Sequence, residues 1–495
     1  MKSLGELVAA AGGTARIVRG APEVRVAGIE TDSRTVRPGA LFAALPGRTS
    51  DGHRYLGAAA AAGAAALLVE PGQGAAAPAG PAIVEAADLR HALGAMAARF
   101  YDHPSGDLDL VGVTGTNGKT TVTWLLEAIA RAAGRKPGVI GTIACRWGVW
   151  ERPAGNTTPE APELQRLLRE MADAGVQVVA LEASSHALEL DRLVDCRFAV
   201  AVFTNLGRDH LDFHRDLEAY GAAKAKLFTA HAPKTSVINA DDPAGARLIA
   251  AARGTVIAYG RGEAAALRAV EISAGAEGLR FVIAAEGQRV PIASPLLGEH
   301  NVANILAAAG AARALGMSWD AVQAGVAACA LVPGRFERVG GCGEGPLVLV
   351  DFAHTPEAVE NALRVARGLC RGKLSVVLGC GGDRDRGKRP LMGAAAALLA
   401  DRAYLTSDNP RSEQPEEILA QILAGAQASG GAAVLRVIED RRAAIRAAVR
   451  DCGAGDVVLI AGKGHEDTQT VGGRTLPFSD REEARRALQE AGCPA

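Results

Sequence analysis

The stretch VGVTGTNGKTT, residues Val111–Thr121, limits the possible folds of this chain more than any other. Its apolar start predicts a strand, and the amphipathic residues that follow it, 122–134, predict a helix. Between them, glycines allow backbone N–H groups to close around phosphates, and Lys119 and Thr120 can reach a terminal phosphate and Mg²⁺. Val113 stands where the commonest phosphate-loop spacing has its first glycine, so the spacing differs. The sequence predicts a strand, a nucleotide-binding loop and a helix in that order.

From the phosphate loop onward, the chain alternates strand-like apolar runs with helical patterns, which is typical of parallel sheets with crossover helices. At 495 residues the chain is too long for one hydrophobic core, and about three domains are expected. The chain is therefore expected to have an α/β fold. Linker-like stretches predict an N-terminal domain at 1–106, a central phosphate-loop domain with a parallel sheet at 107–332, and a C-terminal domain at 333–495. In this last domain, four apolar strands each end in a glycine- or proline-containing loop, where open α/β sheets bind ligands.

Charge and cysteine content exclude several classes of protein. Lys+Arg total 54 and Asp+Glu total 55, so the net charge of -1 provides no basic field for nucleic acid or an anionic membrane. The eight cysteines form no CxxC pair, which argues against a disulfide framework or a zinc knuckle and favours a reducing cytoplasm. We find no apolar stretch long enough to span a bilayer, so the sequence predicts a soluble protein.

Two polar residues follow the next predicted strands after the phosphate loop. Glu182 lies in VVALEASSHAL and His210 in VFTNLGRDHLDFH, and each comes just after an apolar run. Because the carboxyl ends of parallel strands share one edge of the sheet, both side chains could reach a cation at the phosphates. The sequence therefore predicts a magnesium site there.

Together these motifs resemble those of the Mur ligases, ATP-dependent enzymes that form amide bonds in cell-wall synthesis. The motifs occur in the family's order and span nearly the whole chain: GTNGKTT, NTTP, LEASSHAL, TNLGRDHLDFH, YGAAKAKLF, LLGEHNVANILAA, PGRFE, VDFAHTPEAVENAL and AGKGHE. Within the family the chain is similar to the third ligase, which adds a diamino acid to UDP-N-acetylmuramoyl-L-alanyl-D-glutamate. TDSR, at Thr31–Arg34, is similar to the uridine-binding N-terminal domain of that member. The resemblance also implies a Rossmann-like C-terminal domain.

The resemblance implies a role for each matching residue. ATP would be held by Gly115, Thr116, Asn117, Gly118, Lys119, Thr120, Thr121, Asn301, Arg335 and His354. Mg²⁺ would be bound by Thr120, Glu182, His210 and a carbamylated Lys224, and Lys119 would complete the catalytic set. The UDP-linked substrate would contact Thr31, Ser33, Arg48, Thr49, Ser50, Asn156, Thr157, Thr158, Ser184 and Arg192. Leu190 departs from the family, which often has glutamine there.

The loop DNPR, Asp408–Arg411, bears on the choice of amino acid. Lysine ends in a lone ammonium, whereas the far end of meso-diaminopimelate carries an ammonium and a carboxylate. A planar arginine pairs with a carboxylate in bidentate fashion, and the DNPR form is associated with the diaminopimelate-adding members. The resemblance implies a diaminopimelate site formed by Arg389, Asp408, Asn409, Pro410, Arg411, Gly464 and Glu466.

The reaction that the resemblance implies makes sense of these residue types. A carboxylate is a poor electrophile, so the γ-phosphoryl group of ATP would first convert the D-glutamate carboxylate into an acyl phosphate, which an amine then attacks. We find no Ser-His-Asp or Cys-His nucleophile in the sequence. The resemblance implies a ligase that adds meso-diaminopimelate, and we expect a cytoplasmic monomer. The alternatives are a lysine-adding ligase, a ligase like folylpolyglutamate synthetase, and a catalytically silent nucleotide-binding protein.

Overall fold

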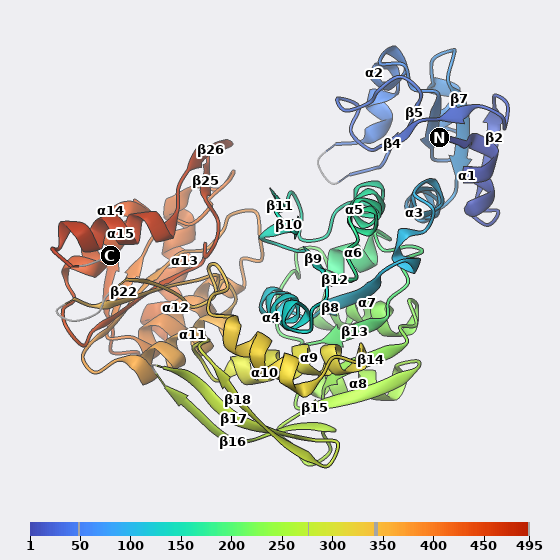
Figure 1. The fold of residues 1–495 in the computed structure, drawn as a ribbon. Coiled ribbons are helices and arrows are strands. Elements are labelled where there is room, and N and C mark those ends of the chain that lie inside the picture. Colours follow the sequence, from blue (N-terminus) through green and yellow to red (C-terminus); the bar gives the residue numbers. More distant parts are fainter. Residues whose placement is uncertain (48–49, 276, 341–344, 494–495) are drawn as a thin grey trace.

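The computed structural model describes residues 1–47, 50–275, 277–340 and 345–493. It contains three large sheets, of 5, 11 and 6 strands, with helices packed against them, so the predicted three-part α/β fold is confirmed. Figure 1 shows the N-terminal part in blue, the central part from cyan to yellow and the C-terminal part in orange and red. Each large sheet draws its strands from one of the three predicted ranges, and we propose domain boundaries at 106/107 and 332/333.

The N-terminal sheet has the strand order β2-β7-β6-β5-β4. Its strands β4 to β7 run parallel, and β2 joins β7 antiparallel. The strands are β2 (Ala15–Arg19), β4 (Gly28–Glu30), β5 (Ala40–Ala43), β6 (Ala66–Val69) and β7 (Ala82–Ala86), with a small pair formed by β1 (Lys2–Ser3) and β3 (Arg25–Val26). The helices are α1 (Leu4–Ala10), α2 (Leu56–Ala61) and α3 (Leu89–Phe100), with short 3-10 turns η1 (Gly52–Tyr55), η2 (Gln73–Ala76) and η3 (Pro104–Gly106).

The central sheet is parallel from β9 through β12, β8, β13, β14 and β15 to β16, with antiparallel strands at both edges that the sequence did not predict. Its parallel strands are β8 (Asp109–Thr114), β9 (Pro137–Ile140), β12 (Val178–Glu182), β13 (Val200–Phe203), β14 (Thr235–Asn239), β15 (Thr255–Gly260) and β16 (Leu267–Gly275). The antiparallel edges add β10 (Ala144–Trp147) and β11 (Trp150–Pro153) on one side, and β17 (Gly278–Ala285) and β18 (Gln288–Ser294) on the other.

Helices cover both faces of the central sheet, since its strands are apolar on both sides. Val111 and Val113 of β8 belong to the core under α4, α9 and α10, whereas Leu110 belongs to the core under α5 to α8. The helices are α4 (Lys119–Ala132), α5 (Ala161–Asp173), α6 (Ser185–Glu189), α7 (Leu217–Thr229), α8 (Pro243–Ala251), α9 (His300–Ala314) and α10 (Trp319–Ala328).

The C-terminal sheet has the order β19-β20-β24-β21-β22-β23, and its four predicted apolar strands are β20, β21, β22 and β24. Its strands are β19 (Glu337–Gly340), β20 (Leu347–Asp351), β21 (Leu374–Leu378), β22 (Arg402–Leu405), β23 (Val434–Val437) and β24 (Val457–Ala461), followed by a separate pair, β25 (Thr468–Val471) and β26 (Arg474–Pro477). The helices are α11 (Pro356–Leu369), α12 (Lys388–Leu399), α13 (Pro415–Ala428), α14 (Arg441–Arg450) and α15 (Asp480–Glu490).

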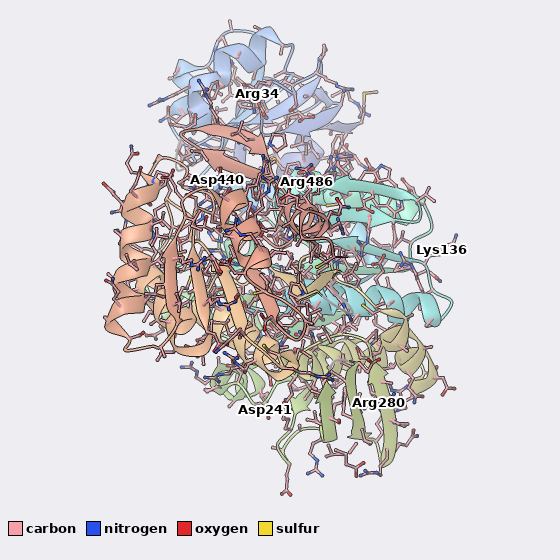
Figure 2. The ribbon with its side chains drawn as sticks, turned by 90° about the vertical axis from the view of Figure 1, so that its left-hand side faces the viewer. Arg34, Lys136, Asp241, Arg280, Asp440 and Arg486 are labelled. Atoms are coloured by element: carbon pink, nitrogen blue, oxygen red, sulfur yellow. The ribbon has the colours of Figure 1, made fainter. Side chains whose placement is uncertain are left out.

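Charged side chains such as Arg34, Lys136 and Arg280 lie on the outside of the ribbon, as Figure 2 shows. Within the described residues, no helix is long and apolar enough to cross a membrane.

Candidate active site

The phosphate loop joins the end of β8 to the start of α4. Gly115 and Gly118 have φ angles of 147° and 90°, which residues with a Cβ rarely adopt. A Cβ on Gly115 would also lie 1.9 Å from Oγ1 of Thr204. Lys119 folds back over the loop, and its Nζ donates to the carbonyl oxygens of Gly115 at 2.8 Å and Thr116 at 2.9 Å. The loop therefore presents a helix N-terminus and a lysine, which suits an anion.

Glu182 is fixed beside this loop at the carboxyl end of β12. It pairs in register with Val113 of β8 and is 1% exposed. The backbone N–H and the hydroxyl of Thr142 each donate to one Glu182 carboxylate oxygen, both at 2.9 Å. Thr142 was not predicted from the sequence, since nothing local marks it as a partner of a residue 40 positions away.

His210 follows β13 and has a left-handed backbone with a φ of 54°. Its ring packs edge-to-face on His186, and its Nε2 lies 3.4 Å from Oδ2 of Asp209. Burial lowers the pKa of His210 to about 3, so the imidazole is neutral at pH 7 and can offer a nitrogen lone pair to a metal.

Lys224 points from α7 toward the same region. It is 1% exposed, and its Nζ lies 4.1 Å from the centre of the Tyr220 ring. Burial, and then the like charge of Lys119, hold the pKa of Lys224 well below its usual range. Its half-buried neighbour Lys226 instead pairs with Glu189 at 2.7 Å.

One cavity of about 260 Å³ unites the predicted phosphate, metal and amino-acid residues. The predicted residues that line it are Thr116, Asn117, Gly118, Lys119, Thr120, Thr157, Glu182, Ser184, His210, Lys224, Arg335, His354, Asp408, Asn409, Arg411 and Glu466. A neighbouring cavity of about 290 Å³ shares Asn117, Gly118 and Arg335 with it and adds Thr121 and Asn301. The phosphate loop thus lines two adjacent cavities.

The C-terminal domain contacts the central domain across these cavities. Arg335 donates to the hydroxyl of Thr120 at 3.0 Å and stacks over Phe352. His354 approaches Asp209 at 3.7 Å. These contacts bring the loops of the C-terminal sheet onto the phosphate loop.

Several residues predicted to contact the UDP-linked substrate lie beneath or away from the cavity. Thr158 is fully buried; its hydroxyl donates to the carbonyl of Glu182 at 2.6 Å, and its own carbonyl accepts from Arg192 at 2.8 Å. Asn156 and Ser50 do not line either cavity, and neither do Thr31 and Ser33, which follow β4 in the N-terminal domain. Arg48 and Thr49 lie outside the described residues. Leu190, which departs from the family pattern, caps the end of α6.

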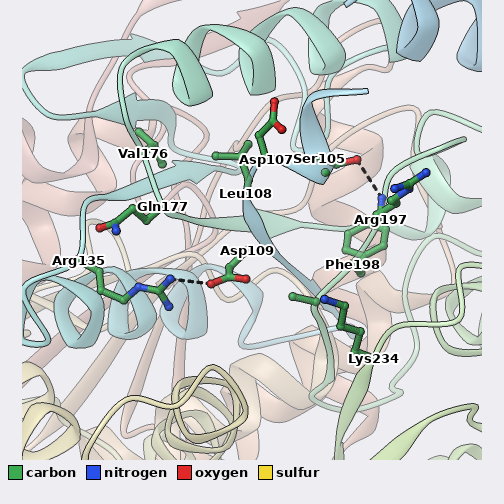
Figure 3. A pocket seen from close by; sticks show the side chains of 12 residues that line it. Ser105, Asp107, Leu108, Asp109, Arg135, Val176, Gln177, Arg197, Phe198 and Lys234 are labelled. Atoms are coloured by element: carbon green, nitrogen blue, oxygen red, sulfur yellow. Dashed lines mark hydrogen bonds and ion pairs between the residues drawn. The ribbon is translucent and has the colours of Figure 1, made fainter. Parts of the chain in front are cut away.

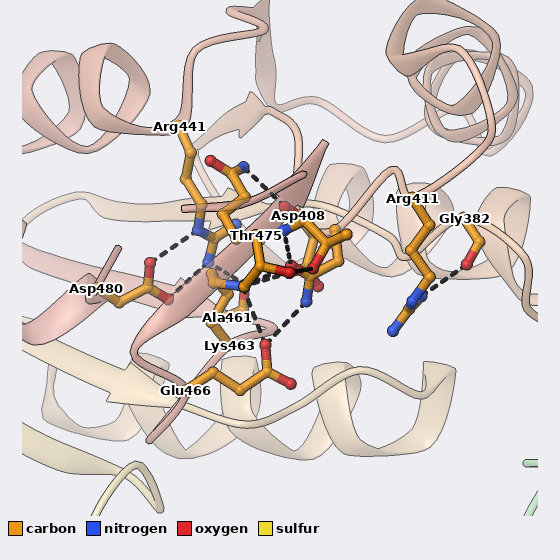
Figure 4. A network of polar contacts seen from close by, with 12 residues as sticks. Gly382, Asp408, Arg411, Arg441, Ala461, Lys463, Glu466, Thr475 and Asp480 are labelled. Atoms are coloured by element: carbon orange, nitrogen blue, oxygen red, sulfur yellow. Dashed lines mark hydrogen bonds and ion pairs between the residues drawn. The ribbon is translucent and has the colours of Figure 1, made fainter. Parts of the chain in front are cut away.

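Arg411 reaches the cavity from the loop after β22. Its guanidinium donates to the carbonyl oxygen of Gly382 at 2.6 Å (Figure 4). Burial, and then the like charge of Arg384, lower the pKa of Arg411. Arg384 lines the same cavity, although the sequence did not single it out. Two guanidinium groups at one end of the cavity favour an anionic ligand.

Arg389 is placed differently from Arg411 and Arg384. It is fully buried at the start of α12 and does not line the cavity. Its two terminal nitrogens bind the carboxylate of Glu413 at 2.8 and 3.0 Å. Hydrogen bonding to Arg389 lowers the pKa of Glu413 to about 2. The guanidinium of Arg389 therefore has a partner within the protein.

Lys463 connects polar side chains of the DNPR loop with one of the AGKGHE motif. This fully buried residue donates from Nζ to Asp408 at 3.3 Å, Asn409 at 3.1 Å and Glu466 at 3.0 Å (Figure 4). It was not predicted as a site residue, although it lies inside the AGKGHE motif. Gly464 and Pro410 shape the backbone here and do not line the cavity.

Another cavity, of about 490 Å³, lies at the amino ends of the central strands (Figure 3). It contains the ion pair of Asp109 with Arg135 at 2.7 Å and none of the predicted site residues.

Among the described residues, one trio of carboxylate and imidazole groups lies close enough to share a metal ion, and it is separate from the phosphate loop. The trio is Asp88, His91 and Asp191. Glu182 and His210 would need further ligands to hold a cation.

Comparison with known protein families matches three successive parts of the chain. Residues 25–101 match the Mur ligase family catalytic domain, 113–312 the Mur ligase middle domain, and 334–464 the Mur ligase glutamate ligase domain. A UDP-N-acetylmuramoyl-L-alanyl-D-glutamate–2,6-diaminopimelate ligase of Geobacter metallireducens is 44% identical over 492 residues, covering 95% of this chain and 96% of the relative. The chain belongs to the Mur ligase family.

Further Mur ligases resemble the whole chain. The ligase of the same name from Streptomyces avermitilis is 47% identical over 475 residues, covering 94% of this chain and 93% of its own. A solved structure of a ligase with this name has a TM-score of 0.68 and 34% identity, and the match covers 100% of both chains. The Mur ligase middle domain holds the phosphate loop, Glu182 and His210, and the glutamate ligase domain holds Arg384 and Arg411.

Proposed function

We propose that this Mur ligase uses ATP to join meso-diaminopimelate to the D-glutamate γ-carboxylate of UDP-N-acetylmuramoyl-L-alanyl-D-glutamate, a step in peptidoglycan precursor synthesis. The observation that carries the proposal is the single cavity in which the phosphate loop faces Arg384 and Arg411. The names of the relatives, which include both substrates, support it.

ATP would lie across the two adjacent cavities. Lys119 and the backbone N–H groups of the phosphate loop would hold its phosphates. Asn301 would contact the base in the neighbouring space, and Arg335 and His354 would cover the nucleotide from the C-terminal domain.

The residues in the cavity fit Mg²⁺, because they offer a carboxylate, a neutral imidazole and a hydroxyl in one place. Glu182, His210 and Thr120 would hold the ion together with a carbamylated Lys224. Carbamylation is proposed because Lys224 is buried with its Nζ against an aromatic ring, and a carbamate would replace this isolated ammonium with an anionic oxygen ligand. Bound Mg²⁺ would neutralise phosphate charge during transfer.

The reaction would proceed through an acyl phosphate. A D-glutamate carboxylate oxygen attacks the γ-phosphorus, and ADP leaves. The amine of diaminopimelate then attacks the acyl carbon, loses a proton and displaces inorganic phosphate. Thr157 and Ser184, which line the cavity beside Glu182, would orient the acceptor, so the protein contributes position and charge rather than a nucleophile.

The far end of diaminopimelate would lie among the loops that follow β21, β22 and β24 of the C-terminal sheet. Arg411 would pair with its carboxylate and share it with Arg384, while Asn409 and Glu466 would accept from its ammonium group. Arg389 would act indirectly, by fixing the start of α12 through Glu413. We also propose that the enzyme works as a cytoplasmic monomer, without nucleic acid or membrane.

An ADP-release assay tests this function against the alternatives. ADP release should require UDP-N-acetylmuramoyl-L-alanyl-D-glutamate together with diaminopimelate. Release with a folate acceptor and glutamate would support a ligase like folylpolyglutamate synthetase, and no release under any condition would support a silent nucleotide-binding protein. With ¹⁸O in the acceptor carboxylate, one label should appear in the released phosphate, and its absence would exclude the acyl phosphate.

A further inference from the structure

The hairpin β25–β26 is a small two-stranded ribbon at the ligand-binding edge of the C-terminal domain. It turns at Gly472 and Gly473, whose φ angles are 54° and 76°, and its last residue pair is Val471 with Arg474. Most of the ribbon is exposed, including Leu476. Because isolated two-stranded hairpins are only marginally stable in water, this one depends on contacts outside itself.

These outside contacts converge on the DNPR loop. For the hairpin as the structure describes it, every hydrogen bond that leaves the ribbon ends on Asp408, Asn409 or Arg411. The Gln469 side chain donates to the carbonyl oxygen of Asp408 at 2.7 Å. The backbone N–H of Thr470 donates to the side-chain oxygen of Asn409 at 3.0 Å.

Arg411 receives the remaining two contacts. Its backbone N–H donates to Thr470 O at 3.1 Å, and its carbonyl oxygen accepts from the N–H of Gly472 at 3.0 Å. Arg411 has a φ of 53°, a left-handed conformation that is unfavourable for a residue with a Cβ and persists only when its surroundings impose it. The hairpin engages both polar backbone groups of this residue, and the direction of the guanidinium depends on this backbone.

We propose that the β25–β26 hairpin is a specificity-determining support of the amino-acid site. It holds Arg411 in its left-handed conformation so that the guanidinium faces the cavity. Gln469 and Thr470 are positioning residues, because they act through the DNPR loop and do not line the cavity. This inference rests on the proposed function, since it assigns to the hairpin the preference for a substrate with a distal carboxylate.

A shortened hairpin tests the proposal. Replacing Thr470–Thr475 with Gly-Gly keeps the pair of Gln469 with Leu476 and closes it with a two-residue turn, so the remaining register is preserved. The N–H donor of Gly472 is deleted, and the residue after Gln469 enters the turn, which removes the extended backbone that presents the Thr470 carbonyl to Arg411. We expect the KM for diaminopimelate to rise about tenfold, the KM values for ATP and the UDP-linked acceptor to change less than about twofold, and the preference for diaminopimelate over lysine to fall.

The matched control is Arg474→Ser, which alters an exposed side chain of the same ribbon and removes no bond to the DNPR loop. It should leave all KM values unchanged. Gln469→Ala is the test variant to use if the shortened chain does not fold. This variant removes only the bond to Asp408, and it should raise the KM for diaminopimelate about threefold and speed amide exchange at Arg411.

A folded shortened variant, or Gln469→Ala, with wild-type KM for diaminopimelate and wild-type preference over lysine would overturn the proposal. So would a uniform loss of kcat with unchanged substrate preference, which indicates a purely structural role. The wild-type enzyme assayed in parallel reports separately on the proposed function. If it does not use diaminopimelate, the exchange rate of the Arg411 amide still decides whether the hairpin holds that residue.

Discussion

Three arginines of the C-terminal domain differ in what surrounds their guanidinium groups. Arg384 and Arg411 line the cavity, whereas Arg389 is buried against Glu413. Loss of one partner of a charge pair costs about 2–5 kcal/mol of binding, so Arg384→Ala and Arg411→Ala should each lower kcat/KM for diaminopimelate at least tenfold. Efficiency with lysine should fall much less. Arg389→Ala should mainly lower Tm, and steady-state kinetics with thermal unfolding would separate the two outcomes.

Glu413 makes the stability of the C-terminal domain dependent on pH. Hydrogen bonding to Arg389 lowers the pKa of Glu413 to about 2, from an ordinary value of 4.5. The pair therefore stabilises the fold fully above about pH 4.5, and this contribution is lost as the pH falls toward 2. The full shift corresponds to about 3 kcal/mol, and after a discount for solvent screening Glu413→Gln should reduce the free energy of unfolding by about 2 kcal/mol at pH 7. The difference from wild type should narrow at pH 3, and an equal difference at both pH values would refute the assignment.

Lys224 can be tested by chemical rescue. Lys224→Ala should lose most activity, because the proposed carbamate oxygen is removed from the magnesium site. Short carboxylic acids should restore part of it by supplying a carboxylate oxygen to the space that is left. Lys226→Ala is the matched control, since this residue pairs with Glu189 outside the cavity. Full activity of Lys224→Ala without added acid would contradict the assignment.

Among the elements, the phosphate loop depends most on the absence of side chains. A Cβ at position 115 would lie 1.9 Å from the Thr204 hydroxyl in a backbone conformation that alanine rarely adopts. Gly115→Ala should therefore raise the KM for ATP at least tenfold, by about 1.4 kcal/mol of binding. Gly106→Ala, where a Cβ meets no atom within 4 Å, should leave the KM unchanged. Nucleotide titration of both variants would check this prediction.

Patterns local to an element were predictable from the sequence, and contacts between elements were not. The phosphate loop and the strands β20, β21, β22 and β24 were predicted because their apolar runs and glycines are contiguous. The stretch GGDRDRGKRP gives no indication of which cation faces the ligand, since α12 begins at Lys388 and turns Arg389 into the interior. Thr142 escaped prediction because it lies in the bend between β9 and β10 and bonds to Glu182 of β12, 40 positions away. The edge strands β17 and β18 alternate buried and more exposed residues, a period-2 signal that the prediction missed.

At the scale of the whole molecule, contacts between domains complete the site. Arg335 reaches Thr120, His354 approaches Asp209, and Arg208 pairs with Asp385 at 3.1 Å. Each contact joins the central domain to the C-terminal domain beside the cavity. The phosphate loop belongs to the central domain and the DNPR loop to the C-terminal domain, and the proposed chemistry requires both.

A competition between the two candidate amino acids tests the central claim most directly. The purified protein would be incubated with ATP, Mg²⁺, UDP-N-acetylmuramoyl-L-alanyl-D-glutamate and equal concentrations of meso-diaminopimelate and L-lysine, and the products separated by mass. The account predicts that the diaminopimelate-containing tripeptide predominates and forms in step with ADP. A predominantly lysine-containing product, or ADP release without either tripeptide, would contradict it.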